Sequence, residues 1–207
     1  MLIYGYKYGN IRSYGGIQLR TEQQILHLVY EDAWMMDILR AARSLKLPDW
    51  WVCAGFVRSK IWDTLHGFTT RTPLPDVDVV YFDADNREEE TEKRLEAKLS
   101  RLLPGIPWSV KNEARMHLKN DLPPYVSSVD AISKFPETAT ALGLTLDAQD
   151  QLTLAAPCGI DDVLQLVLRP TPLFAQQERL ALIYEQRIAA KNWQAVWNRI
   201  TVFHIEH

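Results

Sequence analysis

The sequence has few of the features that mark secreted or membrane-bound proteins. It contains only two cysteines, Cys53 and Cys158, among its 207 residues. They lie far apart in apolar surroundings, which predicts free core residues in a reducing compartment rather than a disulfide framework. No run approaches the ~20 apolar residues of a membrane-spanning helix, and the first sixteen residues lack the apolar core of a secretion signal. We therefore expect a cytoplasmic protein without a membrane partner.

Strong charge of either sign is also missing. The 23 basic and 26 acidic residues give a formal net charge of −3, which provides no overall attraction to nucleic acid but permits a local basic patch. There is no internal repeat and no low-complexity linker. The length suits a single domain over 1–207. We expect it to comprise an irregular arm at 1–20, a core at about 21–170 and a C-terminal helical segment at about 171–207.

The spacing of apolar residues predicts an α/β (α+β) protein with a mixed sheet flanked by helices. Strands are expected at about 51–54, 76–83 and 107–117 as neighbours in one sheet, with a β-hairpin at 143–157. Helices are expected at about 22–46, 57–66 and 87–103, with short helical pieces near 128–134 and 137–141, a helix beginning near 159 and a helical stretch from about 171 to the end. Asn86 is expected to cap the helix at 87–103.

Two aspartates open the second predicted strand, DVDVVYFD. Asp76 and Asp78 alternate with Val77 and Val79, so both carboxylates should point to one face of the sheet. They would lie roughly 7 Å apart along the backbone and would repel each other unless a positive charge lay between them. Oxygen ligands favour a hard cation such as Mg²⁺ or Mn²⁺. The alternative is that the two residues simply begin the strand at the solvent edge.

A second feature precedes these aspartates by about twenty residues. Gly55 ends an apolar strand pattern and starts a helical one, and Arg58 falls in the first turn of that helix. A helix N-terminus presents free N–H groups and the positive end of a dipole to an anion, and a glycine there allows close approach of the backbone. A phosphate cradle next to a hard-metal site is what metal-assisted chemistry on a nucleoside triphosphate requires.

Five segments together resemble a known family. They are WWVCAGFVRSKIWDTLHG, DVDVVYFD, WSVKNEARMH, FPETATALGL and APCGIDDVLQLVLRP, which span about 50–170. They resemble nucleotidyltransferase family 6, a bacterial family of the polymerase-β-type nucleotidyltransferase superfamily. The wider pattern G-G-x-V-R-D…L-L-G…D-h-D of tRNA CCA-adding enzymes and poly(A) polymerases is similar as well. Ala54 replaces the first glycine of that pattern and Ser59 replaces its aspartate, which weakens the case for tRNA as substrate.

The resemblance implies a polymerase-β-like fold and a metal-dependent enzyme. It would transfer a nucleoside monophosphate from an NTP to an unknown acceptor hydroxyl by a two-metal mechanism, with Mg²⁺ or Mn²⁺ as cofactor. The acceptor could belong to a small molecule, a protein or RNA. The alternatives are a nucleotide-binding module without turnover and an interaction protein that has kept the fold, because fold alone does not decide function.

The superfamily usually has a third metal carboxylate on a neighbouring strand. Alternation along WSVKNEARMHL places Lys111, Glu113, Arg115 and His117 on one face. Glu113 is then the natural third ligand, and Lys111 and Arg115 would flank the phosphates. The other interpretation of this segment is a solvated face of an edge strand. Since relatives commonly carry glutamine where Glu113 stands, Asp130 is an alternative third carboxylate.

Overall fold

The computed structural model of the protein describes residues 19–205, so most of the arm expected at 1–20 lies outside the described residues. Its centre is a five-stranded sheet in the order β3-β2-β1-β4-β5. The strands are β1 (Trp51–Cys53), β2 (Val77–Tyr81), β3 (Trp108–Asn112), β4 (Gly143–Leu146) and β5 (Leu152–Ala155). β2 and β3 are parallel and the other neighbours are antiparallel. This arrangement confirms the mixed sheet, the neighbouring strands and the hairpin.

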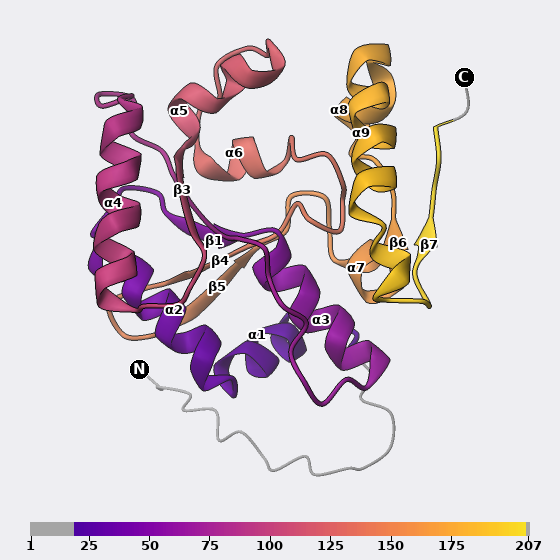
Figure 1. The fold of residues 1–207 in the computed structure, drawn as a ribbon, viewed down its shortest axis with the longest axis horizontal. Helices are drawn as coiled ribbons and strands as arrows, with labels where there is room; N and C mark the ends of the chain where they lie inside the picture. Colours follow the sequence, from indigo (N-terminus) through magenta and orange to yellow (C-terminus); the bar gives the residue numbers. More distant parts are fainter. Residues whose placement is uncertain (1–18, 206–207) are drawn as a thin grey trace, which may run out of the picture.

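One face of the sheet carries the main hydrophobic core. Val110, Val79, Val52 and Leu144 form a row of register partners across four strands, and all are fully buried. Helices α1 (Glu22–Tyr30), α2 (Ala33–Ser44) and α4 (Glu89–Leu102) supply apolar side chains to the same core. Figure 1 shows these helices below and to the left of the sheet. Val77 and Val79, which alternate with the two aspartates, therefore face away from any site that the aspartates form.

The neighbouring row on the opposite face is different in character. Its register partners are Ser109, Asp78, Cys53 and Gly143. A Cβ on Gly143 would lie 3.1 Å from both the Cys53 sulfur and a methyl carbon of Ile132, so this glycine allows helix α6 (Ser128–Ile132) to approach the sheet. This second face is only partly covered by apolar side chains, and it carries the polar residues that sequence analysis singled out.

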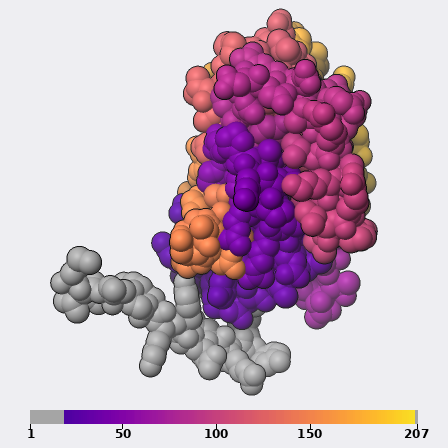
Figure 2. All heavy atoms as spheres, turned by 90° about the vertical axis from the view of Figure 1, so that its left-hand side faces the viewer, coloured from indigo at the N-terminus to yellow at the C-terminus, as the bar shows by residue number. Residues whose placement is uncertain are grey.

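The remaining elements lie outside the five-stranded sheet. They are α3 (Gly55–His66), α5 (Glu113–Met116), η1 (His117–Asn120), α7 (Asp161–Leu164), β6 (Val167–Leu168), α8 (Pro172–Gln176), α9 (Glu178–Lys191), η2 (Trp193–Ala195) and β7 (Thr201–Val202), where η marks a 3₁₀ helix. In Figure 1, α9 lies on the side of the molecule opposite α4. Figure 2 shows the side of the molecule on which α4 lies. Magenta and pink atoms cover much of its upper part, and the yellow C-terminal segment is visible only along the edge. Every helix within residues 19–205 is too short or too polar to cross a membrane.

Two predicted helix boundaries are wrong because side chains were assigned the wrong structural role. The helix expected at 22–46 is two helices, since Asp32 acts as the N-cap of α2 and accepts a hydrogen bond from the Met35 amide at 3.2 Å. Asn86 does not cap α4, whose N-cap residue is Glu88. The Asn86 side-chain oxygen instead accepts a hydrogen bond from the Glu88 amide at 3.3 Å, one turn before the helix begins.

Three further segments differ from the prediction. The strand expected at 107–117 ends at Asn112, whose side chain accepts the Ala114 amide at 3.1 Å and so caps α5. Residues 137–141 form turns rather than a helix, and the helix expected from 159 covers only α7 before the chain enters β6. The helical stretch expected to reach the C-terminus stops after η2, and β7 then pairs with β6.

Candidate active site

A cleft of about 710 Å³ opens on the second face of the sheet. It is lined by residues from the N-terminus of α3, the start of β2, β3, α5, α6 and the C-terminal elements α8, α9 and η2. Of the residues singled out from the sequence, Gly55, Arg58, Asp76, Asp78, Lys111 and Glu113 line it, whereas Arg115, Asp130 and His117 do not. The structure therefore brings both predicted features, the paired aspartates and the strand-to-helix turn, into one cavity.

Asp76 and Asp78 are both partly buried, while Val77 and Val79 between and after them are fully buried on the other face. Burial, followed by repulsion from Asp76, raises the pKa of Asp78 to about 6, although a hydrogen bond with the Ser109 side chain opposes the shift. The alternation predicted for this strand is confirmed. Two carboxylates placed in this way favour a cation between them.

Glu113 lines the cleft, but a helix positions it and not the strand that the sequence pattern predicted. It is the first residue of α5, not a strand residue, and only 5% of it is exposed. Burial, together with the nearby Asp78 and Glu92 carboxylates, raises the pKa of Glu113 to about 8. Three carboxylates thus contribute to one region of negative potential, in which holding all three ionised is unfavourable without a cation.

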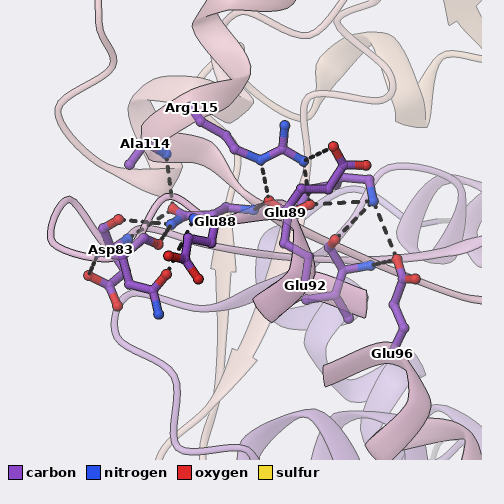
Figure 3. Close-up of polar contacts among 11 residues, drawn as sticks. Asp83, Glu88, Glu89, Glu92, Glu96, Ala114 and Arg115 are labelled. Atoms are coloured by element: carbon purple, nitrogen blue, oxygen red, sulfur yellow. Dashed lines mark hydrogen bonds and ion pairs between the residues drawn. The ribbon is translucent and has the colours of Figure 1, made fainter. Parts of the chain in front are cut away.

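The position of Glu113 depends on a clamp from α4, shown in Figure 3. Glu92 is fully buried, and its two carboxylate oxygens accept hydrogen bonds from Arg115 Nε at 2.7 Å and Arg115 Nη2 at 2.6 Å. It also accepts the Asn112 amide at 2.9 Å. This clamp holds the residues on both sides of Glu113 and turns the chain from β3 into α5.

The same clamp accounts for the two cations expected beside the phosphates. Arg115 binds Glu92 and does not line the cleft. Lys111 stands on the cleft face of β3, yet its ammonium lies 3.3 Å from Glu96 and 3.6 Å from Glu92. Asp130, the alternative third carboxylate, pairs with Lys134 and accepts the Val126 amide. The arrangement therefore favours Glu113 over Asp130 as a neighbour of the paired aspartates.

The strand-to-helix turn forms as expected, but the unusual backbone lies one residue earlier. Ala54, the N-cap residue of α3, has φ 54° and ψ −117°, a conformation that residues with a Cβ rarely adopt. A Cβ on Gly55 would lie 3.7 Å from Arg58 and 3.8 Å from Leu74, which are ordinary contacts. Glycine at 55 is therefore not needed for the turn itself, and its role in approaching a ligand stays a prediction.

Arg58 is held by three tryptophans while it lines the cleft. Its guanidinium carbon lies 5.2 Å from the ring centre of Trp62, 4.7 Å from that of Trp193 and 5.1 Å from that of Trp197. The residue is 5% exposed. Burial lowers its pKa to about 10, which keeps it charged at neutral pH. Its Nη2 donates to the Ser59 hydroxyl at 3.0 Å, and its buried Nε has no partner among residues 19–205.

The cations on the C-terminal side of the cleft were not predicted from the sequence. Besides Lys119 and Lys134, the cleft is lined by Arg187 and Lys191 of α9. The one signal for the latter pair was their i,i+4 spacing, which places both on one helix face. That spacing does not reveal that α9 packs over the cleft rather than against another surface.

The mixed sheet flanked by helices has the polymerase-β-like architecture of nucleotidyltransferases. A family model described as a nucleotidyltransferase matches residues 40–202, and the chain belongs to that family. No protein among the curated ones matches the chain.

Solved structures support the same fold. An NMR structure described as revealing a CCA-adding enzyme head domain is 36% identical, with a TM-score of 0.81, and the match covers 92% of this chain and 100% of that one. A CCA-adding enzyme in complex with CTP is 15% identical with a TM-score of 0.55, and the Thermotoga maritima CCA-adding enzyme complexed with tRNA is 16% identical with a TM-score of 0.53. Each of these two matches covers 89% of this chain, which spans only 44% and 43% of theirs, so they show the fold alone.

Proposed function

We propose that the protein transfers a nucleoside monophosphate from a nucleoside triphosphate to an acceptor hydroxyl and releases pyrophosphate. The observation that carries this proposal is the convergence of Asp76, Asp78 and Arg58 in one cleft of a nucleotidyltransferase-family chain. The CCA-adding enzymes of the same fold that were solved with CTP and with tRNA support an NTP as donor and a hydroxyl of RNA as one candidate acceptor. A hydroxyl of a small molecule or a protein remains an equal candidate.

The residues of the acidic wall, Asp76, Asp78 and Glu113, fit a hard divalent cation. All their donors are carboxylate oxygens, which suit Mg²⁺ and Mn²⁺. Within residues 19–205 no three such side chains converge into a ready-made metal site, which fits an ion that completes its shell with waters and substrate phosphates. Two bound ions would neutralise the reacting phosphate and the leaving group and lower the pKa of the acceptor hydroxyl.

The chain itself performs the positioning. Asp76 and Asp78 would hold the divalent cation, which would in turn bring the phosphate to the start of β2. The first N–H groups of α3 face the anion, and Arg58 adds a charge-assisted hydrogen bond. Glu113, fixed by the Glu92 clamp, lies beside Asp78, where it orients the acceptor hydroxyl. Arg58 and Glu113 are each only 5% exposed, and the low dielectric around them strengthens their interactions with a ligand.

The proposal is tested by assaying pyrophosphate release from each of the four NTPs with Mg²⁺ or Mn²⁺. Wild-type protein should release pyrophosphate, and Asp78→Asn should reduce the rate by at least about a hundredfold while the protein stays folded. Asp85→Asn, an exposed carboxylate that follows the same strand, is the matched control and should behave like wild type. Nucleotide binding without release by any NTP would contradict the enzyme and support a binding module.

A further inference from the structure

Two arginines from distant parts of the chain share one tryptophan in the cleft. The guanidinium carbon of Arg58 lies 4.7 Å from the ring centre of Trp193, and that of Arg187 lies 5.6 Å from it. Both arginines line the cleft. The charge of Arg187 disfavours the charge of Arg58, so the pair repels in the absence of an anion. A shared aromatic ring fixes the planes of both groups and leaves their edges available.

Arg187 has most of its hydrogen-bonding capacity unused. Its Nε donates to Glu137 Oε1 at 2.6 Å, and Glu137 is fully buried behind the cleft wall, where its other oxygen accepts from the Thr140 hydroxyl at 2.7 Å. Neither Nη1 nor Nη2 of Arg187 has a hydrogen-bond partner among residues 19–205. A guanidinium anchored through one nitrogen with both terminal groups free is arranged for bidentate contact with a phosphate.

Arg58 adds a second donor set beside it. The Arg58 side chain is buried, yet within residues 19–205 its Nε lacks a partner and its guanidinium makes a hydrogen bond only to Ser59. Such an unsatisfied charged donor is costly unless a ligand completes it. Lys119 and Lys191 also line the cleft and make no ion pair with any residue between 19 and 205. Within residues 19–205, this side of the cleft therefore offers several donors whose hydrogen-bonding capacity is only partly used.

The acidic wall and the opposite, cationic wall, which carries Arg58 and Arg187, act on each other electrostatically. Arg187 lowers the pKa of Asp78, and Asp76 favours the charged form of Arg58. A triphosphate that places its α-phosphate at Asp76 and Asp78 would therefore extend its remaining phosphates toward the two arginines. The cleft volume of about 710 Å³ leaves room for the whole chain of phosphates.

We propose that Arg58 and Arg187, braced by Trp193, form a binding site for the β- and γ-phosphates of the NTP and hence for the pyrophosphate product. This inference deepens the proposed function, on which it rests for the identity of the natural ligand. It assigns to α9 a direct part in the site, and it makes Glu137 a positioning residue that aims Arg187.

The test uses inorganic tripolyphosphate in EDTA, a probe that has no base, needs no metal and permits no turnover. Binding to the full chain is measured by calorimetry and by tryptophan fluorescence, to which Trp193 contributes as one of seven tryptophans. Wild type should bind, and Arg187→Lys should weaken binding by about tenfold because lysine lacks the planar fork. The matched control is Arg169→Lys, an arginine that pairs with Asp162 and stacks on Phe203 away from the cleft; its affinity should equal that of wild type. No binding to wild type, or equal losses in both variants, would overturn the proposal.

Glu137→Gln separates a ligand site from a purely structural ion pair. The amide keeps the volume and an oxygen that still accepts from Arg187 Nε, so the aim of Arg187 is retained while the neighbouring negative charge is removed. If the arginines bind phosphate, affinity for tripolyphosphate should stay equal or rise by up to about tenfold. If the ion pair merely fixes α9, Glu137→Gln should weaken binding as Arg187→Lys does, and the inference would be wrong.

The outcomes for this site and for the proposed function are distinguishable. Arg187-dependent binding of tripolyphosphate without pyrophosphate release from any NTP would retain the phosphate site and reject the transferase. Pyrophosphate release with the same KM for NTP in wild type and Arg187→Lys would retain the transferase and reject the site. Thermal unfolding of each variant shows that the compared proteins are folded.

Discussion

The acidic and cationic walls of the cleft differ in how their charged side chains are stabilised. On the acidic wall, Asp76 raises the pKa of Asp78 and Asp78 raises that of Glu113, and the nearby cation Arg115 is engaged by Glu92 outside the cleft. On the cationic wall, Arg58 and Arg187 stack on Trp193 and keep free N–H groups.

This difference indicates which charge a ligand must bring to each wall to stabilise it. The acidic wall is unfavourable alone, because its carboxylates repel each other without a cation. On the cationic wall, Trp193 contacts both guanidinium groups and Glu137 binds Arg187, so phosphate binding there should need little reorganisation. The cleft is therefore arranged for a ligand that brings positive metal charge to one wall and negative phosphate charge to the other.

The largest expected effect comes from the acidic wall. Glu113→Gln should lower kcat by at least about a hundredfold and change NTP affinity by less than about threefold, because it removes the residue that orients the acceptor and leaves the phosphate contacts intact. Steady-state pyrophosphate release and equilibrium NTP titration measure the two effects. Asp130→Asn is the control and should retain turnover, since Asp130 does not line the cleft. Full activity of Glu113→Gln would remove Glu113 from the site.

On the cationic wall, Arg58→Ala should weaken NTP binding by roughly ten- to a hundredfold, since a charge-assisted hydrogen bond contributes about 1.5–3 kcal/mol. Titration of NTP with Mg²⁺ present measures this effect. Arg71→Ala is a matched control because Arg71 also stacks on a tryptophan, 3.9 Å from the Trp34 ring centre, and pairs with Asp32 outside the cleft. It should destabilise the fold without changing NTP affinity, and an equal loss for both variants would mean that stacking, not phosphate contact, explains the Arg58 result.

The sequence predicted the parts of the site that depend on local periodicity. Asp76 and Asp78 share a face because strand side chains alternate, and Gly55 with Arg58 marks a strand-to-helix turn. Both inferences needed only the residues within each segment, and in each case the structure places those residues in the cleft.

The parts it could not predict are determined by contacts between distant segments. The polar and apolar alternation continues past Asn112, but Glu92 of α4 binds the Asn112 amide and the Arg115 side chain and so ends the strand. Asp32 looked like an interior helix residue, yet it caps α2 and pairs with Lys60. Arg187 enters the site only because α9 packs over the cleft, and no local pattern specifies that packing.

The burial and mutual repulsion of carboxylates on the acidic wall predict how the free energy of unfolding depends on pH in metal-free protein. The pKa of Glu113 is raised from 4.5 to about 8, so between these values the folded state binds more protons than the unfolded chain, and the free energy of unfolding falls as pH rises. Glu113→Gln removes this contribution. Its stability advantage over wild type in EDTA should grow from about zero at pH 4.5 to about 1–3 kcal/mol at pH 8, as measured by urea unfolding.

The charged neighbours of Glu113 are Asp78 and Glu92, which raise its pKa, and Arg115 and Lys119, which lower it. Adding Mg²⁺ should shrink the advantage of Glu113→Gln at pH 8, because the cation would stabilise the ionised carboxylates of wild type. A difference between the two proteins that stays constant from pH 5 to pH 8 would mean that Glu113 does not titrate in this range.

The smallest expected effect lies at the turn that joins the two walls. Ala54 adopts φ 54° and ψ −117°, where a Cβ costs about 1–3 kcal/mol, whereas glycine loses only about 0.5–1 kcal/mol of extra entropy. Ala54→Gly should therefore raise the free energy of unfolding by about 1 kcal/mol and leave NTP affinity unchanged.

The neighbouring Gly55→Ala is the paired variant: its new Cβ meets only ordinary contacts at 3.7 and 3.8 Å, so stability should change little, but affinity for NTP should fall if the backbone there approaches the phosphates. If Ala54→Gly lowers NTP affinity, the shape of the turn matters for binding. If Gly55→Ala leaves NTP affinity unchanged, the backbone at residue 55 does not closely approach the phosphates.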